Sequence, residues 1–184
     1  MRQWRQEDAK LLAEIYAQPE FQEHNPALDL AQTRAQILRF TLGWRNDGLS
    51  LWAAEELESG AFVGRIGLIR HHDWPEAPDP VEVGWTLHRD WWGRGLATEG
   101  GRAALECWRR YLDDQELISI STPANKRSRA VMERLGMTLR GETGWHGHHV
   151  LWYALDRDAS AARPAEQRRS ASAPPRHGRR GRRT

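Results

Sequence analysis

The stretch VEVGWTLHRDWWGRGLATEGGRAALECWRRY, residues 81–111, decides the fold. Its first seven residues alternate apolar and polar side chains, and this period of two predicts a half-buried strand. Its last third repeats apolar residues at three- and four-residue spacing, which predicts a helix. Between them, Gly93 and Gly95 form a tight turn. Glycines let backbone N–H groups approach a ligand closely, and the following helix offers unpaired donors and the positive end of its dipole. We therefore expect this turn to suit a pyrophosphate.

The turn resembles the acetyl-CoA signature of the GNAT superfamily of N-acetyltransferases. The family pattern is Arg/Gln-x-x-Gly-x-Gly/Ala, and residues 92–97 read Trp-Gly-Arg-Gly-Leu-Ala, with Trp92 in place of the first Arg or Gln. That departure is tolerable where backbone amides bind most of the phosphate. The spacing differs from the Gly-x-Gly-x-x-Gly and Walker patterns, which disfavours dinucleotide and nucleotide sites.

A second resemblance lies after an apolar strand predicted at residues 117–121. GNAT enzymes commonly carry Asn-x-x-Ser at the start of a helix that ends in Leu-Gly-Phe, and this chain has Asn125, Ser128 and then Leu-Gly-Met at 135–137. Capping of the helix by Asn125 or Ser128, and a C-cap at Gly136, are the structural alternatives.

Hydrophobic periodicity and turn residues predict the remaining elements. We expect strands at 2–5, 50–55 and 61–70, a helix from about residue 8 that Pro19 stops, and a second helix at about 30–44. Strands at 138–141 and 150–155, joined by a loop at 142–149, close the sheet. The resemblance covers about residues 2–156 and implies an α+β (mixed α/β) GNAT fold. That fold has a central, mostly antiparallel twisted sheet of about six to seven strands, flanked by about four helices.

Composition divides the chain into a domain at 1–156 and an Arg-rich tail at 157–184. The tail lacks apolar periodicity and is rich in Arg, Ala, Ser, Pro and Gly, so we expect it to be disordered. It carries nine arginines and two acids, a net charge of +7, which leaves −5 for the domain out of the overall +2. Such a tail is either simply solvated or makes weak contact with RNA or another polyanion.

Several further expectations concern location and partners. The sequence has no apolar run of about 18 residues and no signal-peptide pattern at its start, which predicts a cytoplasmic protein with no membrane segment. We also expect a bacterial source. His71, His72 and Asp73 match no standard zinc spacing, and no cysteine pairs with them, so we expect no metal. Dimers are frequent in this family, so a homodimer is among the expected partners.

The resemblance implies that acetyl-CoA is the co-substrate. In the GNAT fold the central strand splays from its neighbour, and the pantetheine arm inserts there like an extra strand. The backbone of Val83, Trp85 and Leu87 would contact that arm. The implied pyrophosphate contacts are Gly93, Arg94, Gly95, Leu96, Ala97 and Thr98, and Asn125 and Ser128 complete the cofactor set.

Acetyl transfer to an amine needs a base for the ammonium and an acid for the leaving thiolate. The resemblance favours Glu82 as the base, because related enzymes often use a glutamate on the central strand; a plain exposed strand acid is the alternative. Other candidate bases are His24, Glu142, His146, His148 and His149.

The acid is less well defined by sequence. Many GNAT enzymes place a tyrosine four residues after the Ser of Asn-x-x-Ser, and this chain has Met132 there. In the branch that acetylates ribosomal-protein N-termini, the serine itself or water serves the thiolate. Ser128 is therefore the candidate acid, with Asn125 holding cofactor or water.

The start Arg-x-Trp-x-x-Glu-Asp at residues 2–8 and the two-helix cap resemble this ribosomal-protein alanine/serine N-acetyltransferase branch. The branch favours a protein or peptide N-terminal α-amine as the acceptor. A small amine or an aminoglycoside is the alternative, and an aminoglycoside would require an acidic pocket. The acids available for such a pocket are Glu20, Glu23, Asp73, Glu76 and Asp79. A non-catalytic acyl-CoA-binding regulator is a third hypothesis, which the intact motif residues disfavour.

Overall fold

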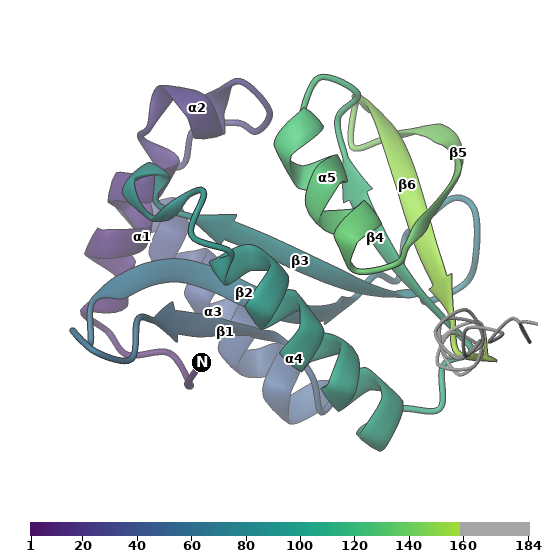
Figure 1. The fold of residues 1–184 in the computed structure, drawn as a ribbon. Helices are drawn as coiled ribbons and strands as arrows, with labels where there is room; N and C mark the ends of the chain where they lie inside the picture. Colours follow the sequence, from purple (N-terminus) through teal and green to yellow (C-terminus); the bar gives the residue numbers. More distant parts are fainter. Residues whose placement is uncertain (159–184) are drawn as a thin grey trace, which may run out of the picture.

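The computed structural model describes residues 1–158. They form a six-stranded sheet in the order β1-β2-β3-β4-β6-β5, in which β3 and β4 are parallel and all other neighbours antiparallel (Figure 1). The strands are β1 (Leu51–Glu55), β2 (Phe62–Arg70), β3 (Val81–Leu87), β4 (Glu116–Ser121), β5 (Thr138–Trp145) and β6 (His148–Asp156). The helices are α1 (Asp8–Tyr16), α2 (Pro19–Gln22), α3 (Leu30–Asn46), α4 (Leu96–Tyr111) and α5 (Lys126–Arg134), with a 3-10 turn at Arg89–Trp91. The expected mixed α+β fold is confirmed.

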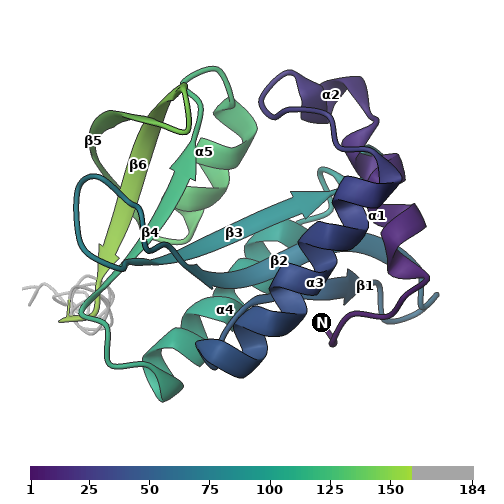
Figure 2. The same ribbon diagram turned by 180° about the vertical axis from the view of Figure 1, so that it is seen from behind.

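Helices cover both faces of the sheet. Figures 1 and 2 show α4 and α5 on one face and α1 and α3 on the other. The main core lies under α4 and α5, where Trp108, Val83 and Met132 are fully buried. A smaller cluster around Leu12 and Tyr16 packs α1 beside α3. In the described residues no helix has the length and apolar character needed to cross a membrane.

Strands β3 and β4 separate shortly after they begin. They pair only at Val81 with Leu117 and at Glu82 with Ile118, whereas β3 stays paired with β2 as far as Leu87. From Val83 onward the edge of β3 that faces β4 therefore has no strand partner. Figure 1 shows the two strands diverging, with α5 beside β4.

One buried side chain spans the start of this gap. The hydroxyl of Ser119 on β4 donates a hydrogen bond of 2.8 Å to the carbonyl of Val83, and Ser119 is only 1% exposed. A buried carbonyl at the point where a ladder ends needs another donor, and the serine supplies it.

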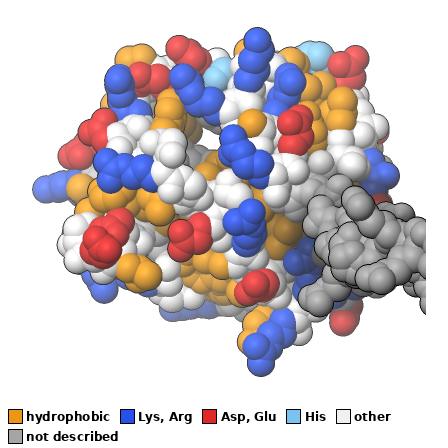
Figure 3. Space-filling model, viewed as in Figure 1, with side chains coloured by type: hydrophobic (Ala, Val, Ile, Leu, Met, Phe, Trp, Pro, Cys, Tyr) orange, Lys and Arg blue, Asp and Glu red, His pale blue; other side chains and the backbone are white. Residues whose placement is uncertain are grey.

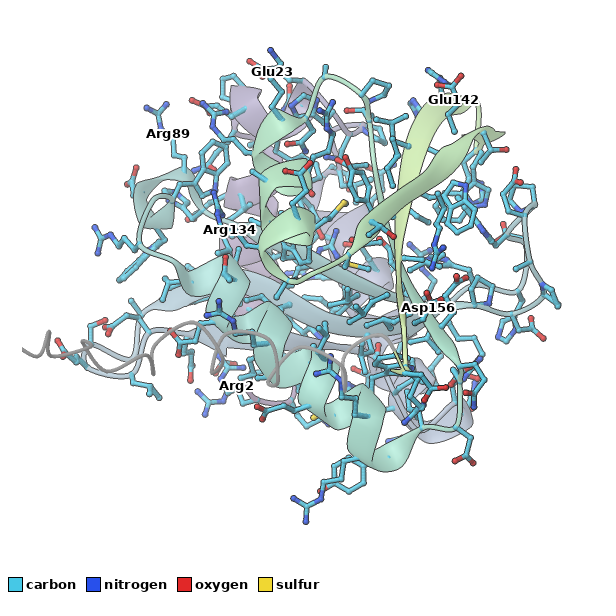
Figure 4. The ribbon with its side chains drawn as sticks, turned by 45° about the vertical axis from the view of Figure 1, so that its right-hand side comes forward. Arg2, Glu23, Arg89, Arg134, Glu142 and Asp156 are labelled. Carbon is cyan, nitrogen blue, oxygen red and sulfur yellow. The ribbon has the colours of Figure 1, made fainter. Side chains whose placement is uncertain are left out.

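Three predicted elements differ from the structure. The strand expected at 2–5 is a single bridge between Arg2 and Ala53. Pro19 ends the first helix but also begins α2, because proline is well suited to the first position of a helix. The loop expected at 142–149 is mostly strand, since β5 and β6 pair up to Trp145 and His148 (Figure 4 shows Glu142 and Asp156 toward opposite ends of this hairpin). β5 is an exposed edge strand, so its sequence lacks the apolar alternation that predicts a strand.

Arg157, the first residue assigned to the tail by sequence, is tied to the domain. Its guanidinium lies 4.8 Å from the centroid of the Trp108 ring. It donates hydrogen bonds to carbonyls of the last turn of α4 and of the residues that follow it, which are Trp108, Arg109, Leu112 and Asp114. The predictions of disorder and polyanion contact concern residues that lie outside the described part of the chain.

Candidate active site

Two adjoining cavities open where β3 and β4 separate. The large cavity, about 800 Å³, lies between α2, the start of α4 and α5. The small cavity, about 400 Å³, lies over β3 and beneath the residues that follow α2 and the β5–β6 turn. Both cavities are lined by His24, Asn25, Trp85, Thr86, Asn125 and Ser128, so they meet at these residues.

The first turn of α4 faces the large cavity. Gly95, the N-cap, has φ 81°, a left-handed conformation that glycine adopts without strain, and no side chain caps the helix. The first backbone N–H groups of α4 are therefore left for a ligand. Together with the helix dipole, they favour an anion at this end of α4. The cavity lining from this turn comprises Gly93, Gly95, Leu96, Ala97 and Thr98.

Cations surround the same cavity. The basic residues in its lining are Arg102 from α4 and Lys126, Arg127 and Arg134 from α5, the last labelled in Figure 4. In Figure 3, Lys and Arg side chains gather around a hollow in this face of the molecule. Glu20, an acid in the lining, is held by Arg89 at 2.6 Å. The cavity is therefore suited to a ligand with several negative charges.

Trp92 stands where the family pattern has Arg or Gln, and it makes a structural contact. Its indole N–H donates to the carbonyl of Leu87 at 2.9 Å, which fixes the turn to the end of β3. The guanidinium of Arg127 lies 4.9 Å from the centroid of the same ring. A cation over an indole face is a favourable arrangement, so Trp92 also orients a cation at the cavity.

Two residues expected to contact the cofactor do not line either cavity. Val83 has no exposed surface and is part of the main core, so only its backbone is near the site. The guanidinium of Arg94 lies 4.6 Å from the centroid of the Trp91 ring, and Arg94 is not part of the lining of either cavity. Trp85 and Leu87 do line the large cavity, together with Asn125 and Ser128.

Glu82 lies in the small cavity, where it is bound on both carboxylate oxygens. Oε2 is 2.6 Å from Nε2 of His71, and Oε1 accepts a longer hydrogen bond of 3.4 Å from the backbone N–H of Ile120. The second contact crosses the gap between β3 and β4. The side chains of His71 and Glu82 are 13% and 16% exposed. The pair is thus held in place, yet each oxygen keeps a lone pair for a further proton.

The environment of His71 favours its charged form. Burial lowers the pKa of His71, but the hydrogen bond and the charge of Glu82, with a smaller effect of Asp73, raise it further, so that the pKa lies above its ordinary value of 6.5. The imidazole also packs edge-on against Trp145, with ring centroids 4.8 Å apart. Sequence patterns did not connect His71 with Glu82, because His71 belongs to an irregular loop.

The structure separates the other candidate bases into two groups. His24, His146 and His148 line the small cavity. Glu142 and His149 do not line either cavity; they lie 3.3 Å apart on the exposed hairpin. His24 also reaches across the site, since its Nδ1 is 3.1 Å from the hydroxyl of Thr122, which precedes α5.

The residues at the start of α5 cap the helix and also lie where the two cavities meet. The side-chain oxygen of Asn125 accepts from the backbone N–H of Ser128 at 3.1 Å, so the capping alternative is correct for Asn125. Both residues still line the two cavities. Met132 has no exposed surface and belongs to the core. Its thioether has no proton to donate, so this position supplies no acid.

Among residues 1–158 no group of three or more His, Cys, Asp or Glu side chains is arranged to hold a metal ion. His71 is instead paired with Glu82, and His72 lies 2.8 Å from Asp79. The adjacent His-His-Asp residues therefore serve separate contacts.

Comparison with known proteins identifies the class. The model of the acetyltransferase (GNAT) domain matches residues 1–138. The chain belongs to this family and is an acyltransferase that depends on acetyl-CoA.

Solved structures agree on the fold. An acetyltransferase from Agrobacterium tumefaciens str. C58 is 26% identical with a TM-score of 0.73, covering 84% of this chain and 88% of its own. The aminoglycoside acetyltransferase AAC(6')-Ib in complex with coenzyme A is 18% identical with a TM-score of 0.73, covering 87% and 95%. RimL, a ribosomal L7/L12 α-N-protein acetyltransferase in complex with coenzyme A, is 16% identical with a TM-score of 0.67, covering 86% and 93%. At these lower identities the likeness concerns the fold, and the acceptors of these enzymes differ.

Proposed function

We propose that this enzyme transfers the acetyl group of acetyl-CoA to a primary amine by direct attack, with Glu82 as the base. The observation that carries the proposal is the junction of the two cavities at Trp85, Thr86 and Ser128. The large cavity has the donors and cations that a CoA pyrophosphate and phosphate require. The small cavity has a fixed carboxylate. Donor and acceptor can therefore meet where the cavities join.

The bond changes follow from these positions. The ammonium of the acceptor loses a proton to Glu82, directly or through water, and the free amine attacks the thioester carbonyl carbon. The C–N bond forms and the C–S bond breaks. The nitrogen then loses its second proton, and the thiolate takes up one from Ser128 or water, so that the proton from the nitrogen replaces the one given to the thiolate. His71 is a positioning residue, because its hydrogen bond fixes the carboxylate of Glu82.

The favoured acceptor is a protein or peptide N-terminal α-amine. The charges of the small cavity disfavour an aminoglycoside, which is a polycation. Glu82 is the acid in its lining, and the lining also contains Arg65 and His71, whose pKa is raised above its ordinary value. The acids considered for an aminoglycoside pocket lie elsewhere: Glu20 lines the large cavity, and Glu23, Asp73, Glu76 and Asp79 line neither.

The proposal is tested with purified enzyme, acetyl-CoA and two acceptor pools, read by mass spectrometry. One pool contains peptides with free N-terminal Ser, Ala or Thr, and the other contains aminoglycosides and simple polyamines. We expect one acetyl group on a peptide α-amine. Acetylation of the second pool alone would move the acceptor to small molecules, and tight CoA binding with no turnover of any amine would favour a regulator.

The role of Glu82 is tested with Glu82→Gln, which keeps the shape of the side chain. We expect kcat to fall by about 10²- to 10⁴-fold, the contribution of a positioned base, while CoA still binds. His71→Gln should show a smaller loss, because it leaves the base in place. A Glu82→Gln enzyme with an unchanged rate across pH would remove Glu82 from this role.

A further inference from the structure

Arg65 on β2 holds a fixed guanidinium in the small cavity. Its Nε donates to the hydroxyl of Tyr16 at 2.9 Å, and that hydroxyl in turn donates to Gln36 Oε1 at 2.5 Å. The guanidinium carbon lies 5.9 Å from the centroid of the Tyr16 ring and 5.7 Å from that of Phe40. These contacts restrict the side chain, but neither terminal nitrogen donates to any of residues 1–158.

No acid within the described residues neutralises this charge. The arginines of residues 1–158 that form ion pairs are Arg2, Arg5, Arg70, Arg89 and Arg140. Tyr16, the hydrogen-bond partner of Arg65, is neutral, because burial raises its pKa by more than the arginine lowers it. Glu82, the acid of the cavity lining, is occupied by His71 and the Ile120 N–H. A positive charge thus faces the cavity unpaired.

The position of Arg65 relates it to the reacting groups. It lies directly opposite Thr86 in the β2–β3 register, and Thr86 belongs to the junction of the two cavities. Glu82 is four positions earlier on β3, so about 13 Å of strand separates it from Thr86. Gly84 lies between them, and because it has no side chain, the small cavity stays open over this part of β3, which we call the floor of the cavity. An acceptor on this floor therefore lies between a base at one end and a cation at the other.

We propose that Arg65 binds a carboxylate carried by the acceptor, so that the substrate class is amines with a nearby carboxylate. This inference rests on the proposed acetyl transfer. A guanidinium with two free terminal nitrogens matches a carboxylate in a bidentate manner, and few other groups use that geometry so well. The carboxylate comes either from a free amino acid or related small amine, or from an acidic side chain close to a peptide N-terminus.

The test uses matched acceptors with and without this carboxylate. Rates are compared at equal concentrations of unprotonated amine, because a carboxamide also lowers the pKa of the neighbouring amine. One arm compares free L-serine, L-alanine and L-glutamate with their α-carboxamides. The other compares Ser-Glu-Ala-Gly with Ser-Gln-Ala-Gly, both with amidated C-termini. We expect the carboxylate to improve kcat/KM by about ten- to hundredfold in one arm, mainly through KM, which is the size of a charged hydrogen-bonded pair. The arm that shows the effect identifies the source.

The variants separate Arg65 from a general charge effect. In Arg65→Gln the preference should vanish, in Arg65→Lys it should persist in part, and in Arg140→Gln it should be unchanged, because Arg140 lines neither cavity. Binding of CoA serves as the check that each variant is folded. Equal rates with acid and amide on the unaltered enzyme would overturn the inference, even if Arg65→Gln did not fold.

A direct binding measurement distinguishes the two proposals. Each compound is titrated into the CoA-saturated protein and followed by tryptophan fluorescence, since Trp145 lines the small cavity. If no amine is acetylated but carboxylates bind more tightly than amides, and only when Arg65 is present, the transfer proposal fails and the anion site stands. If amines are acetylated with no preference for a carboxylate, the anion-site proposal fails and the transfer proposal stands. Absence of both binding and turnover overturns the anion site as well.

Discussion

Replacing Ser119 with alanine should weaken the fold at the point where the sheet opens. The hydroxyl of Ser119 is the donor to the Val83 carbonyl at 2.8 Å, and both residues are buried. Alanine removes the donor and leaves this carbonyl unpaired, which costs about 1–3 kcal/mol. For a chain of this size each kcal/mol lowers Tm by about 2–4 °C, so we expect a decrease of about 2–12 °C.

The free energy of unfolding is measured by urea unfolding at pH 7 followed by tryptophan fluorescence, and Tm by thermal unfolding. The free energy should fall by about 1–3 kcal/mol, while its slope m against urea concentration stays unchanged. Ser121→Ala is the matched control, because Ser121 is on the same strand and is 9% exposed, but its hydroxyl bonds to none of residues 1–158. The control should change the free energy of unfolding by about 0.5 kcal/mol or less. If Ser119→Ala loses no more than this control, the serine does not hold the separated strands together.

Three further predictions concern the cavities. Burial lowers the pKa of His71, but Glu82 raises it by more, so the folded-state pKa lies above the ordinary value. The stability that protonated His71 contributes is therefore complete below about pH 6.5 and is lost as pH rises through the raised pKa. The free energy of unfolding of His71→Gln, measured from pH 5 to 9, should lack this loss, and curves of stability against pH that run parallel for the variant and the unaltered enzyme would contradict the prediction. Arg127→Ala should raise KM for acetyl-CoA about tenfold with kcat unchanged, as measured by steady-state kinetics, and a change in kcat alone would count against a binding role. Gly84→Val should raise the KM for the acceptor at least about tenfold while the KM for acetyl-CoA stays constant. The reason is that a Cβ at this position would lie 3.6 Å from Glu82 Oε1 within the small cavity. An unchanged acceptor KM would show that the acceptor binds elsewhere.

The sequence predicted those parts of the fold whose signals are local. The β3–turn–α4 unit could be recognised because strand alternation, two glycines and helical spacing occur within one stretch of chain. β3 has the predicted bounds, and α4 begins directly after Gly95. The Asn125 cap was also within reach, since a cap bonds to an N–H three residues away.

The parts that were missed depend on pairing between distant segments. β5 is strand because β6 pairs with it, and its own exposed side chains carry no alternating signal. The His71–Glu82 pair brings a loop onto the central strand, and Arg65 meets Tyr16 from α1 across 49 positions of sequence. The periodicity of a sequence carries no information about such contacts between distant segments. A partial signal existed for the cations of the large cavity, because Lys126 and Arg127 directly follow Asn125 in the second motif.

The binding of Arg157 to the end of α4 sets a practical limit for truncation. A chain cut after Asp156 would leave the carbonyls of Leu112 and Asp114 without their guanidinium donor and would uncover one face of Trp108. A chain cut after Asp158 would keep all of these contacts. Tolerance to shortening depends on which backbone groups lose partners rather than on where composition changes, so the stable domain extends past the start of the arginine-rich sequence.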